Sequence, residues 1–367
     1  MRRFLAIATT LCISVMACRP VSAQMPGTSD QADMPMTAAS RQQLLDSLIK
    51  EVNNSYVFPD MAKKVDLLLR ERQQRGAYGS ITSARQLSEA LTHDLQKFTK
   101  DRHLRVMYSE KAIPMNKPDG RQTPEDVASK LARMRANNFG VEKIEHLPFN
   151  IGYLELSGFA SANAAADTLA AAMVVLAHTD ALIIDLRKNG GGDAATVALL
   201  AGYLFDKRTH LNDFYDRRGS RTEQRWTADV KPGLRYGAQK DVYILSSKDT
   251  FSAAEDFTYA LKNMKRVTVV GETTGGGANA GDVFRLSPNF AAFVPYSRAI
   301  SPITNTNWET VGVTPDVDVR AGDALKIAQA AILTKMTIAE KDSAKLGRLN
   351  DRIVEVLDED TRRSPVQ

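Results

Sequence analysis

Between residues 151 and 270, short apolar segments alternate with longer segments of helical periodicity, and this alternation is the sequence feature that most constrains the fold. The expected strands are 151–156, 181–186, 242–245 and 267–270, and the expected helices are 162–178, 194–204 and 253–264. Strands that are apolar throughout are typical of a sheet that is buried on both faces. Strands that alternate with helices indicate βα units. The pattern therefore predicts an α/β domain.

A helical pattern precedes this domain, because apolar residues recur at helical spacing in three runs between Ser40 and Thr99. Helices with one apolar face each bury those faces by packing together, which predicts an N-terminal helical bundle. We expect the bundle at 40–108, a linker at 109–150, the α/β core at 151–320 and a charged helical tail on the outside at 321–367. Within the core, 211–229 is expected to form a hairpin around Gly219 and Ser220.

The N-terminus has the pattern of a secretory signal peptide at residues 1–23. Arg2 and Arg3 are followed by a short apolar run and by the small-residue exit Val21-Ser22-Ala23. This pattern predicts a secreted or periplasmic protein without a membrane span. A flexible leader is expected to follow the signal peptide at 24–39. The alternative is a lipoprotein, because Val15-Met16-Ala17-Cys18 resembles a bacterial lipobox and would place a lipid anchor on Cys18.

Cysteine content and charge exclude several classes of function. The two cysteines, Cys12 and Cys18, both lie in the signal segment, so a chain cut after Ala23 has no thiol for a disulfide or a nucleophile. The chain has 48 basic and 43 acidic residues, and three basic residues belong to the signal segment. This near balance gives little electrostatic reason to expect nucleic acid. None of the five histidines has metal-ligand spacing, so we predict no metal and no cofactor.

A glycine-rich segment, Asp185 to Asp193, follows one expected strand and precedes a helix. Its three consecutive glycines, Gly190 to Gly192, allow positive φ angles and free N–H groups near a helix N-terminus. Such N–H groups suit a phosphate or a developing oxyanion. The segment matches neither GxGxxG nor a Walker loop. The alternative is a tight strand-to-helix turn, which explains one glycine but less easily three.

A second strand-to-helix junction carries Ser252. Ser252 and Glu255 have the spacing of a capping box, which needs no chemistry. The same position would present the Ser252 hydroxyl at the positive end of a helix dipole beside the Ala253 N–H, as a nucleophile requires. Local spacing favours the cap, with the nucleophile as the alternative.

Two further residues are candidates for acid–base chemistry. His103 lies at a junction between a helix and a strand, where an imidazole can act as a general base, although it is one of five histidines. Glu309 follows Trp308, and a carboxylate beside a tryptophan can be partly desolvated and can orient an imidazole. The alternative for Glu309 is a solvated loop residue.

Five segments in this order resemble the tail-specific, or carboxy-terminal-processing, serine peptidase family, in the branch of the tricorn core and the interphotoreceptor retinoid-binding protein. They are DRH at 101–103, IIDLRKNGGG at 183–192, TFSAAEDF at 250–257, VVGETTGGGAN at 269–279 and WETVGVTPDVDV at 308–319. The resemblance implies a crotonase-like (ClpP/crotonase) ββα core and peptide hydrolysis through an acyl-enzyme. It implies Ser252 as the nucleophile, His103 as the general base and Glu309 as the acidic residue of the charge network. It also implies an oxyanion hole from the N–H groups of Gly191 and Ala253.

The chain departs from the family pattern at two places. Family members with a Ser-Lys dyad carry a lysine in the loop that matches 273–277, and this loop has none, so we favour the histidine base. Many members also insert a PDZ domain between bundle and core. Residues 109–150 are too few for one, so we predict that the PDZ domain is absent.

Two functions follow as hypotheses. The first is an exported serine-type endopeptidase that hydrolyses peptides or unfolded protein chains, with its oligomeric state left open. The second is a non-catalytic protein on the same fold that binds an apolar ligand, retinoid-like or lipid-like, or a peptide. The presence of Ser252, His103 and Glu309 together favours the enzyme, because a pure binder has no physical need for all three.

Overall fold

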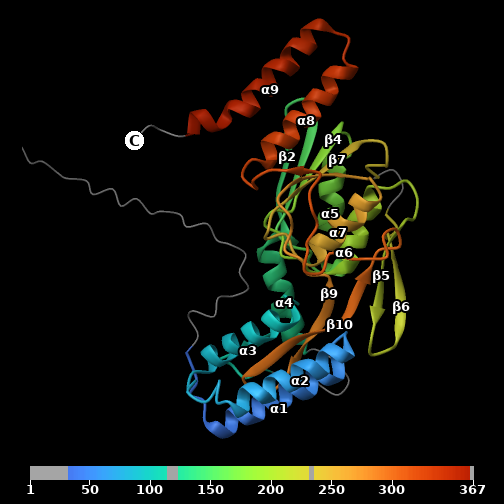
Figure 1. Cartoon of the computed structure of the whole chain (residues 1–367). Coiled ribbons are helices and arrows are strands. Elements are labelled where there is room, and N and C mark those ends of the chain that lie inside the picture. Colours follow the sequence, from blue (N-terminus) through green and yellow to red (C-terminus); the bar gives the residue numbers. More distant parts are fainter. Residues whose placement is uncertain (1–31, 114–122, 231–234, 364–367) are drawn as a thin grey trace, which may run out of the picture.

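A computed structural model describes residues 32–113, 123–230 and 235–363. The expected signal peptide and the Cys18 alternative lie outside these residues. Within them, no helix is both long and apolar enough to cross a membrane. The described part of the chain has mixed α/β architecture, with two sheets and helices around them (Figure 1).

The larger sheet has six strands in the order β11-β8-β7-β4-β3-β2. Its central strands β3 (Ile151–Leu156), β4 (Ala181–Asp185), β7 (Asp241–Ser246) and β8 (Thr268–Gly271) pair in parallel. All four had been predicted, with bounds that differ by at most one residue. The edge strands are β11 (Val317–Asp318), which is parallel to β8, and β2 (Val141–Leu147), which is antiparallel to β3.

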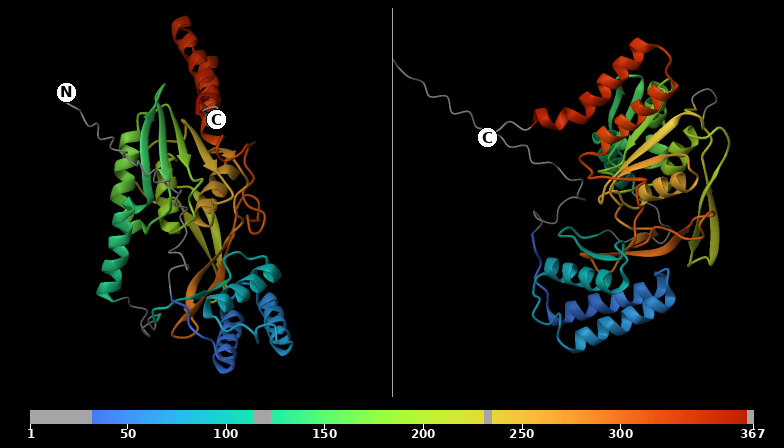
Figure 2. Two further views of the ribbon diagram at one scale, coloured as in Figure 1. Left: turned by 90° about the vertical axis from the view of Figure 1, so that its left-hand side faces the viewer. Right: turned by 45° about the horizontal axis from the view of Figure 1, so that its top comes forward.

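Helices cover both faces of this sheet, which explains why its strands are apolar throughout. On β4, Leu182 and Ile184 pack into one core with α5 (Ala162–Leu176), α6 (Ala194–Tyr203) and α7 (Ala253–Asn263). Ile183 faces the opposite way and packs into a second core with α8 (Ala324–Ala339) and α9 (Ser343–Arg363). The tail expected on the outside includes α8, which covers this second face of the sheet and buries Ile332 and Leu333 against it. Figure 2 shows α9 extending beyond the sheet.

The smaller sheet is antiparallel and joins the core to the bundle. Its order is β1-β10-β5-β6, and β9 pairs with β10 as well. The strands are β1 (Arg105–Tyr108), β5 (His210–Asp216), β6 (Arg221–Trp226), β9 (Asn279–Arg285) and β10 (Phe290–Ile300). The β5–β6 hairpin confirms the expected turn, and Ser220 in that turn has a φ of 46°. The β9–β10 hairpin had not been predicted.

Helices α1 (Ala38–Ser55), α2 (Pro59–Gln74) and α3 (Ala84–Thr99) form the three-helix bundle. Their apolar faces share one core with β1 and β10, in which Leu48, Leu91 and Phe290 are almost fully buried. The bundle therefore packs against the smaller sheet, at the opposite end of the molecule from α9 (Figure 1).

Two of the expected segments differ from their predictions. The end of the leader, from residue 32, is packed, because Met36 is buried in the bundle core and its N–H donates to Thr82 at 2.8 Å. The expected linker at 109–150 contains α4 (Pro124–Ala136), the short 3-10 helix η1 (Asn138–Gly140) and β2. Because β2 pairs along β3, it belongs to the larger sheet and moves the start of that sheet to Val141.

Candidate active site

Ser252 lies at the start of α7, after the turn that follows β7. The Phe251 N–H donates to the Asn189 carbonyl at 3.0 Å, and the Thr250 hydroxyl donates to the Leu186 carbonyl at 2.8 Å. These bonds hold the turn against the glycine-rich segment that follows β4. Ser252 itself has a φ of 56° and a ψ of −117°, a conformation rarely adopted by residues other than glycine. Backbone strain of this kind is concentrated at functional sites.

The buried carboxylate of Glu255 holds this strained backbone in place. It accepts hydrogen bonds from the N–H groups of Ser252 at 2.9 Å, Gly276 at 2.6 Å and Gly277 at 2.8 Å, and also from the Thr274 hydroxyl. Burial raises the pKa of Glu255, and these hydrogen bonds oppose that rise. The capping interaction expected from the sequence is therefore present on the Glu255 side. It also fixes the loop 274–277, a role that the local spacing did not reveal.

Gly191 and Ala253 were the expected donors of an oxyanion hole. A Cβ added to Gly191 would lie 2.7 Å from the Ser252 Cβ, and the φ of Gly191 is +104°, so glycine is required for this close approach. The Gly191 N–H donates to Asn189 Oδ1 at 2.9 Å, whereas the Ala253 N–H has no acceptor in the described part of the chain. Of the two donors, only that of Ala253 is free in this conformation.

His103 lies in the turn between α3 and β1, in a stack of aromatic and cationic side chains. Its ring lies 4.5 Å from that of Phe251 and 5.5 Å from that of Phe293, between centroids. The guanidinium groups of Arg102 and Arg105 lie over these phenyl rings, at 5.3 and 5.2 Å. Burial, together with the charges of Arg105 and Arg102, lowers the pKa of His103 to about 3. The imidazole is therefore neutral at physiological pH, and in this conformation it is a weak base, because burial and the two arginines disfavour its protonated form.

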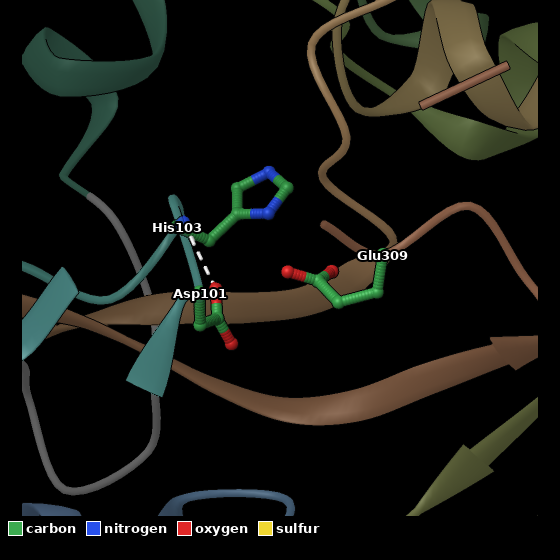
Figure 3. Close-up of side chains that lie close together, drawn as sticks. All are labelled: Asp101, His103 and Glu309. Atoms are coloured by element: carbon green, nitrogen blue, oxygen red, sulfur yellow. Dashed lines mark hydrogen bonds between the residues drawn. The ribbon is translucent and has the colours of Figure 1, made fainter. Parts of the chain in front are cut away.

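Glu309 and Asp101 lie beside this imidazole (Figure 3). Glu309 Oε2 accepts hydrogen bonds from the N–H groups of Ala278 at 2.6 Å and Asn279 at 3.0 Å. Its other oxygen, Oε1, is buried without a partner, and so is His103 Nδ1. Figure 3 shows the Glu309 carboxylate directed toward the nearer ring nitrogen of His103. Burial, and secondarily the charge of Asp101, raises the pKa of Glu309 to about 8.

Asp101 was not predicted, and it links the site to the bundle. Its carboxylate accepts hydrogen bonds from the His103 N–H at 2.9 Å, the Tyr56 hydroxyl at 3.1 Å and Asn279 Nδ2 at 3.0 Å. Burial raises its pKa, and these three donors oppose the rise. Tyr56 and Asn279 are distant in the chain, so no local spacing could have identified this network.

One atom each of Asp101, His103 and Glu309 lies within 4.8 Å of the others, which makes them a group that can hold a metal ion. The sequence had predicted no metal, on the basis of local spacing alone. Two carboxylates and an imidazole are suitable ligands for a divalent cation. The same arrangement is that of a general base and the carboxylate that orients it.

No hydrogen bond joins His103 to Ser252. The Phe251 ring packs on the imidazole and directly precedes Ser252. A Cβ on Gly277 would lie 2.3 Å from Phe251 Cζ and 2.7 Å from His103 Cε1, so only glycine fits at this contact. Catalytic hydrogen bonds are often long in proteins without substrate and tighten when substrate binds.

A cavity of about 60 Å³ adjoins Ser252. Its walls are mostly apolar, and the one ionisable group among them is Asp256, one helical turn after Ser252. The cavity is lined by Gly192, Ala194, Phe214, Ser252, Ala253, Asp256, Gly277, Ala278, Asn279, Ala280 and Trp308.

Comparison with protein families places two domains on the chain. Residues 150–319 match the model of peptidase family S41, and residues 32–138 match the N-terminal domain of S41 peptidases in eukaryotic interphotoreceptor retinoid-binding protein. The first domain contains Ser252 and Glu309, and the second contains Asp101 and His103.

Among curated proteins, carboxyl-terminal-processing peptidase 2 of Arabidopsis thaliana chloroplasts is 31% identical over 166 residues. This alignment covers 45% of the chain but 31% of the relative, so the chain spans about a third of that protein's length. A lipoprotein structure from Streptococcus agalactiae aligns with a TM-score of 0.53 at 12% identity, over 83% of this chain and all of that one. The tricorn protease aligns with a TM-score of 0.50 at 13% identity, over 86% of this chain and 37% of that one. The two structural matches establish similarity of fold.

Proposed function

This chain belongs to peptidase family S41, and from that premise we propose that it is a serine-type endopeptidase with Ser252 as its nucleophile. The observation that carries the proposal is the Ser252 backbone, which is strained at a helix N-terminus and held by the buried Glu255. A capping serine does not need a positive φ angle, because N-cap residues normally have an extended backbone. Exposure of a nucleophile on a sharp strand-to-helix turn provides a reason for the strain.

In the proposed reaction, Ser252 Oγ attacks the carbonyl carbon of a peptide bond while His103 takes its proton. The resulting imidazolium then gives that proton to the leaving amine, and water hydrolyses the acyl-enzyme. The Ala253 N–H donates to the oxyanion. Gly191 joins it as the second donor when its N–H leaves Asn189 Oδ1. His103 has to approach Ser252 when substrate binds, since the two side chains are not hydrogen-bonded in this conformation.

Glu309 is proposed to orient His103 through Nδ1. Its unpartnered Oε1 and the unpartnered Nδ1 of His103 are both buried in the same group of side chains. A hydrogen bond between them would satisfy both atoms and direct Nε2 toward the nucleophile. It would also stabilise the imidazolium, which burial otherwise disfavours.

The finer features of fold and location are proposals as well. We propose a crotonase-like core without a PDZ domain. In support, the described residues between β1 and β3 form α4, η1 and a strand of the larger sheet. We also propose export by a signal peptide at 1–23, with a lipid anchor at Cys18 as the alternative.

Substitution of the nucleophile tests the proposal. We expect Ser252→Ala to lower the hydrolysis of an unfolded protein substrate by about 10³- to 10⁶-fold, with an unchanged melting temperature. His103→Ala should have a similar effect, and the double variant should be no slower than either single variant, because nucleophile and base act as a unit. Full activity in Ser252→Ala would show that the site works by different chemistry.

The alternative of a binding protein for an apolar ligand gains little support at this site. Ligand pockets usually have volumes of about 300–1,000 Å³, whereas the cavity at Ser252 has about 60 Å³. Binding of a retinoid-like ligand by Ser252→Ala and by the unchanged protein with equal affinity, without hydrolysis by either, would favour the binding protein.

A further inference from the structure

The cavity beside Ser252 has a volume of about 60 Å³, which limits the size of the substrate group that can bind in it. One water molecule needs about 10–15 Å³ of such cavity volume, so the cavity accommodates a short side chain. Phe214 and the fully buried Trp308 form rigid walls, and the remaining apolar walls are glycines and alanines. Enlargement would therefore require displacement of packed aromatic rings.

Asp256 makes one wall of this cavity polar. It is 4% exposed, and Asn212 Nδ2 donates to its Oδ1 at 2.6 Å. In the described part of the chain, Oδ2 has no hydrogen-bond donor. Asn212 is itself fully buried, so the carboxylate cannot rotate away without breaking its one hydrogen bond. Because Asp256 lines the cavity and holds one hydrogen bond, its carboxylate can accept another from a group bound there.

Arg225 acts on this carboxylate from a distance but packs on another side chain. Burial raises the pKa of Asp256, and the charge of Arg225 on β6 opposes that rise. The Arg225 guanidinium lies over the Phe214 ring at 4.3 Å and forms no ion pair with Asp256. Arg225 thus favours the ionised form of Asp256 against the effect of burial, without donating a hydrogen bond to its carboxylate. A hydroxyl group, which is small and donates one hydrogen bond, fits both the volume and the acceptor.

We propose that this cavity binds the side chain of the acyl residue, the substrate residue whose carbonyl carbon Ser252 attacks, and that it selects serine or threonine there. The inference rests on the proposed peptidase function. The acyl residue is favoured because its side chain begins one bond from the attacked carbonyl, and Ser252 and Ala253 both line the cavity. Asp256 Oδ2 accepts the hydroxyl hydrogen bond, and Phe214 and Trp308 exclude larger side chains.

The test is a series of peptides that differ only at the acyl residue, carrying Gly, Ala, Ser, Thr, Val, Leu or Phe. We expect kcat/KM to be about 10- to 100-fold higher for Ser than for Ala, and for Thr than for Val, because a hydrogen bond to a charged group is lost. Leu and Phe should be cleaved at least about 100-fold more slowly than Ser. Equal rates for Ser, Leu and Phe would overturn the inference, and so would a size limit on the residue after the scissile bond.

Two variants separate the roles of acceptor and volume. Asp256→Ala should bring the Ser-to-Ala ratio close to 1 and increase the cleavage of Val and Leu. Ala280→Leu, on an exposed position of β9, fills the cavity and should slow the cleavage of Ser and Thr peptides more than that of Gly peptides. Val283→Leu is the matched control, because it adds volume on the same strand outside the cavity. If Ala280→Leu leaves the preference unchanged, the side chain binds elsewhere.

Labelling with a small fluorophosphonate distinguishes this inference from the proposed function. A protein that is labelled at Ser252 and cleaves all seven peptides equally well is a serine peptidase without the proposed selectivity. If neither labelling nor cleavage occurs, the proposed function fails and this inference fails with it.

Discussion

Two buried atoms of the site, His103 Nδ1 and Glu309 Oε1, have no hydrogen-bond partner in the described part of the chain. Buried polar atoms without partners cost about 1–3 kcal/mol each, so the folded protein retains them at the expense of stability. Mobility of the base provides a physical reason for that cost. A hydrogen bond to Nδ1 in this conformation would fix the imidazole in place, whereas without one it can move toward Ser252.

The ionisation of Glu309 should give activity and stability opposite dependences on pH. Its pKa in the folded protein is raised to about 8, from about 4.3 in an unfolded chain. The protonated carboxyl is therefore favoured by folding, and this contribution to stability is complete below pH 4.3 and is lost as the pH rises through 8. Activity requires the ionised carboxylate as the acceptor of Nδ1–H, so kcat/KM should rise as the pH approaches and exceeds 8.

Glu309→Gln tests this assignment. We expect kcat/KM to fall by about 10²- to 10⁴-fold. The free energy of unfolding in urea should also decline less between pH 7 and 9 than in the unchanged protein. The ionisation of His103 does not contribute in that range. Because its pKa is lowered in the folded protein, it reduces the free energy of unfolding only as the pH falls below about 6.5. Glu223→Gln, on the exposed strand β6, is the control and should change neither quantity. An identical pH profile in Glu309→Gln would assign the titration to another group.

Residue types and their order along the chain were sufficient to propose Ser252, His103 and Glu309, but only through resemblance to a family. Asp101 was quoted as part of a motif without a role, because its partners Tyr56 and Asn279 come from α1 and β9. Glu255 was interpreted as a capping partner, since its bonds to the loop 274–277 cross 19 or more residues. The spacing of residues in the sequence identifies hydrogen bonds between near neighbours. This site is held together by hydrogen bonds between residues that are distant in the sequence.

At the scale of elements, periodicity predicted the strands that are apolar throughout and the helices between them. It missed β2, whose residues are mostly exposed, and the β9–β10 hairpin, in which only one residue of β9 is buried. Such strands are stabilised by pairing with a neighbour, and propensity within the segment gives little signal of that pairing. The sequence predicted α8 as a helix but not its position on the sheet. That position depends on the apolar side chains that β4 and β7 present on their second face.

The contribution of α8 can be measured with two variants of one helix. Leu333 is 1% exposed and packs against the sheet, so Leu333→Ala should lower the free energy of unfolding by about 2–5 kcal/mol. Ile338 is 82% exposed on the same helix, and Ile338→Ala should change it by less than about 0.5 kcal/mol. Chemical denaturation of both variants provides the comparison. Equal effects would mean that α8 does not cover the sheet in solution.

At the scale of the molecule, the proposed nucleophile and base come from different layers. Ser252 follows a strand of the larger sheet, whereas His103 lies between the bundle and the smaller sheet. Arg217, after β5, donates to the carbonyls of Asn53 and Tyr56, and the Tyr56 hydroxyl reaches Asp101. The C-terminal end of α1 thus belongs to the support of the catalytic base, so the position of the bundle and the geometry of the site are coupled.

Two buried tyrosines allow this coupling to be tested, because each donates from its hydroxyl to a buried aspartate. Tyr56 bonds to Asp101 in the site, and Tyr78 bonds to Asp94 inside the bundle at 2.7 Å. Tyr56→Phe and Tyr78→Phe should each lower the free energy of unfolding by about 1–3 kcal/mol, since each leaves a buried carboxylate with one donor fewer. Only Tyr56→Phe should also lower kcat, by about tenfold with little change in KM, because Asp101 and the backbone of His103 then lose a fixed position. Rates measured on fully folded protein, at a temperature well below both transitions, separate this effect from unfolding. Equal loss of kcat in both variants would mean that the bundle acts on the site only through overall stability.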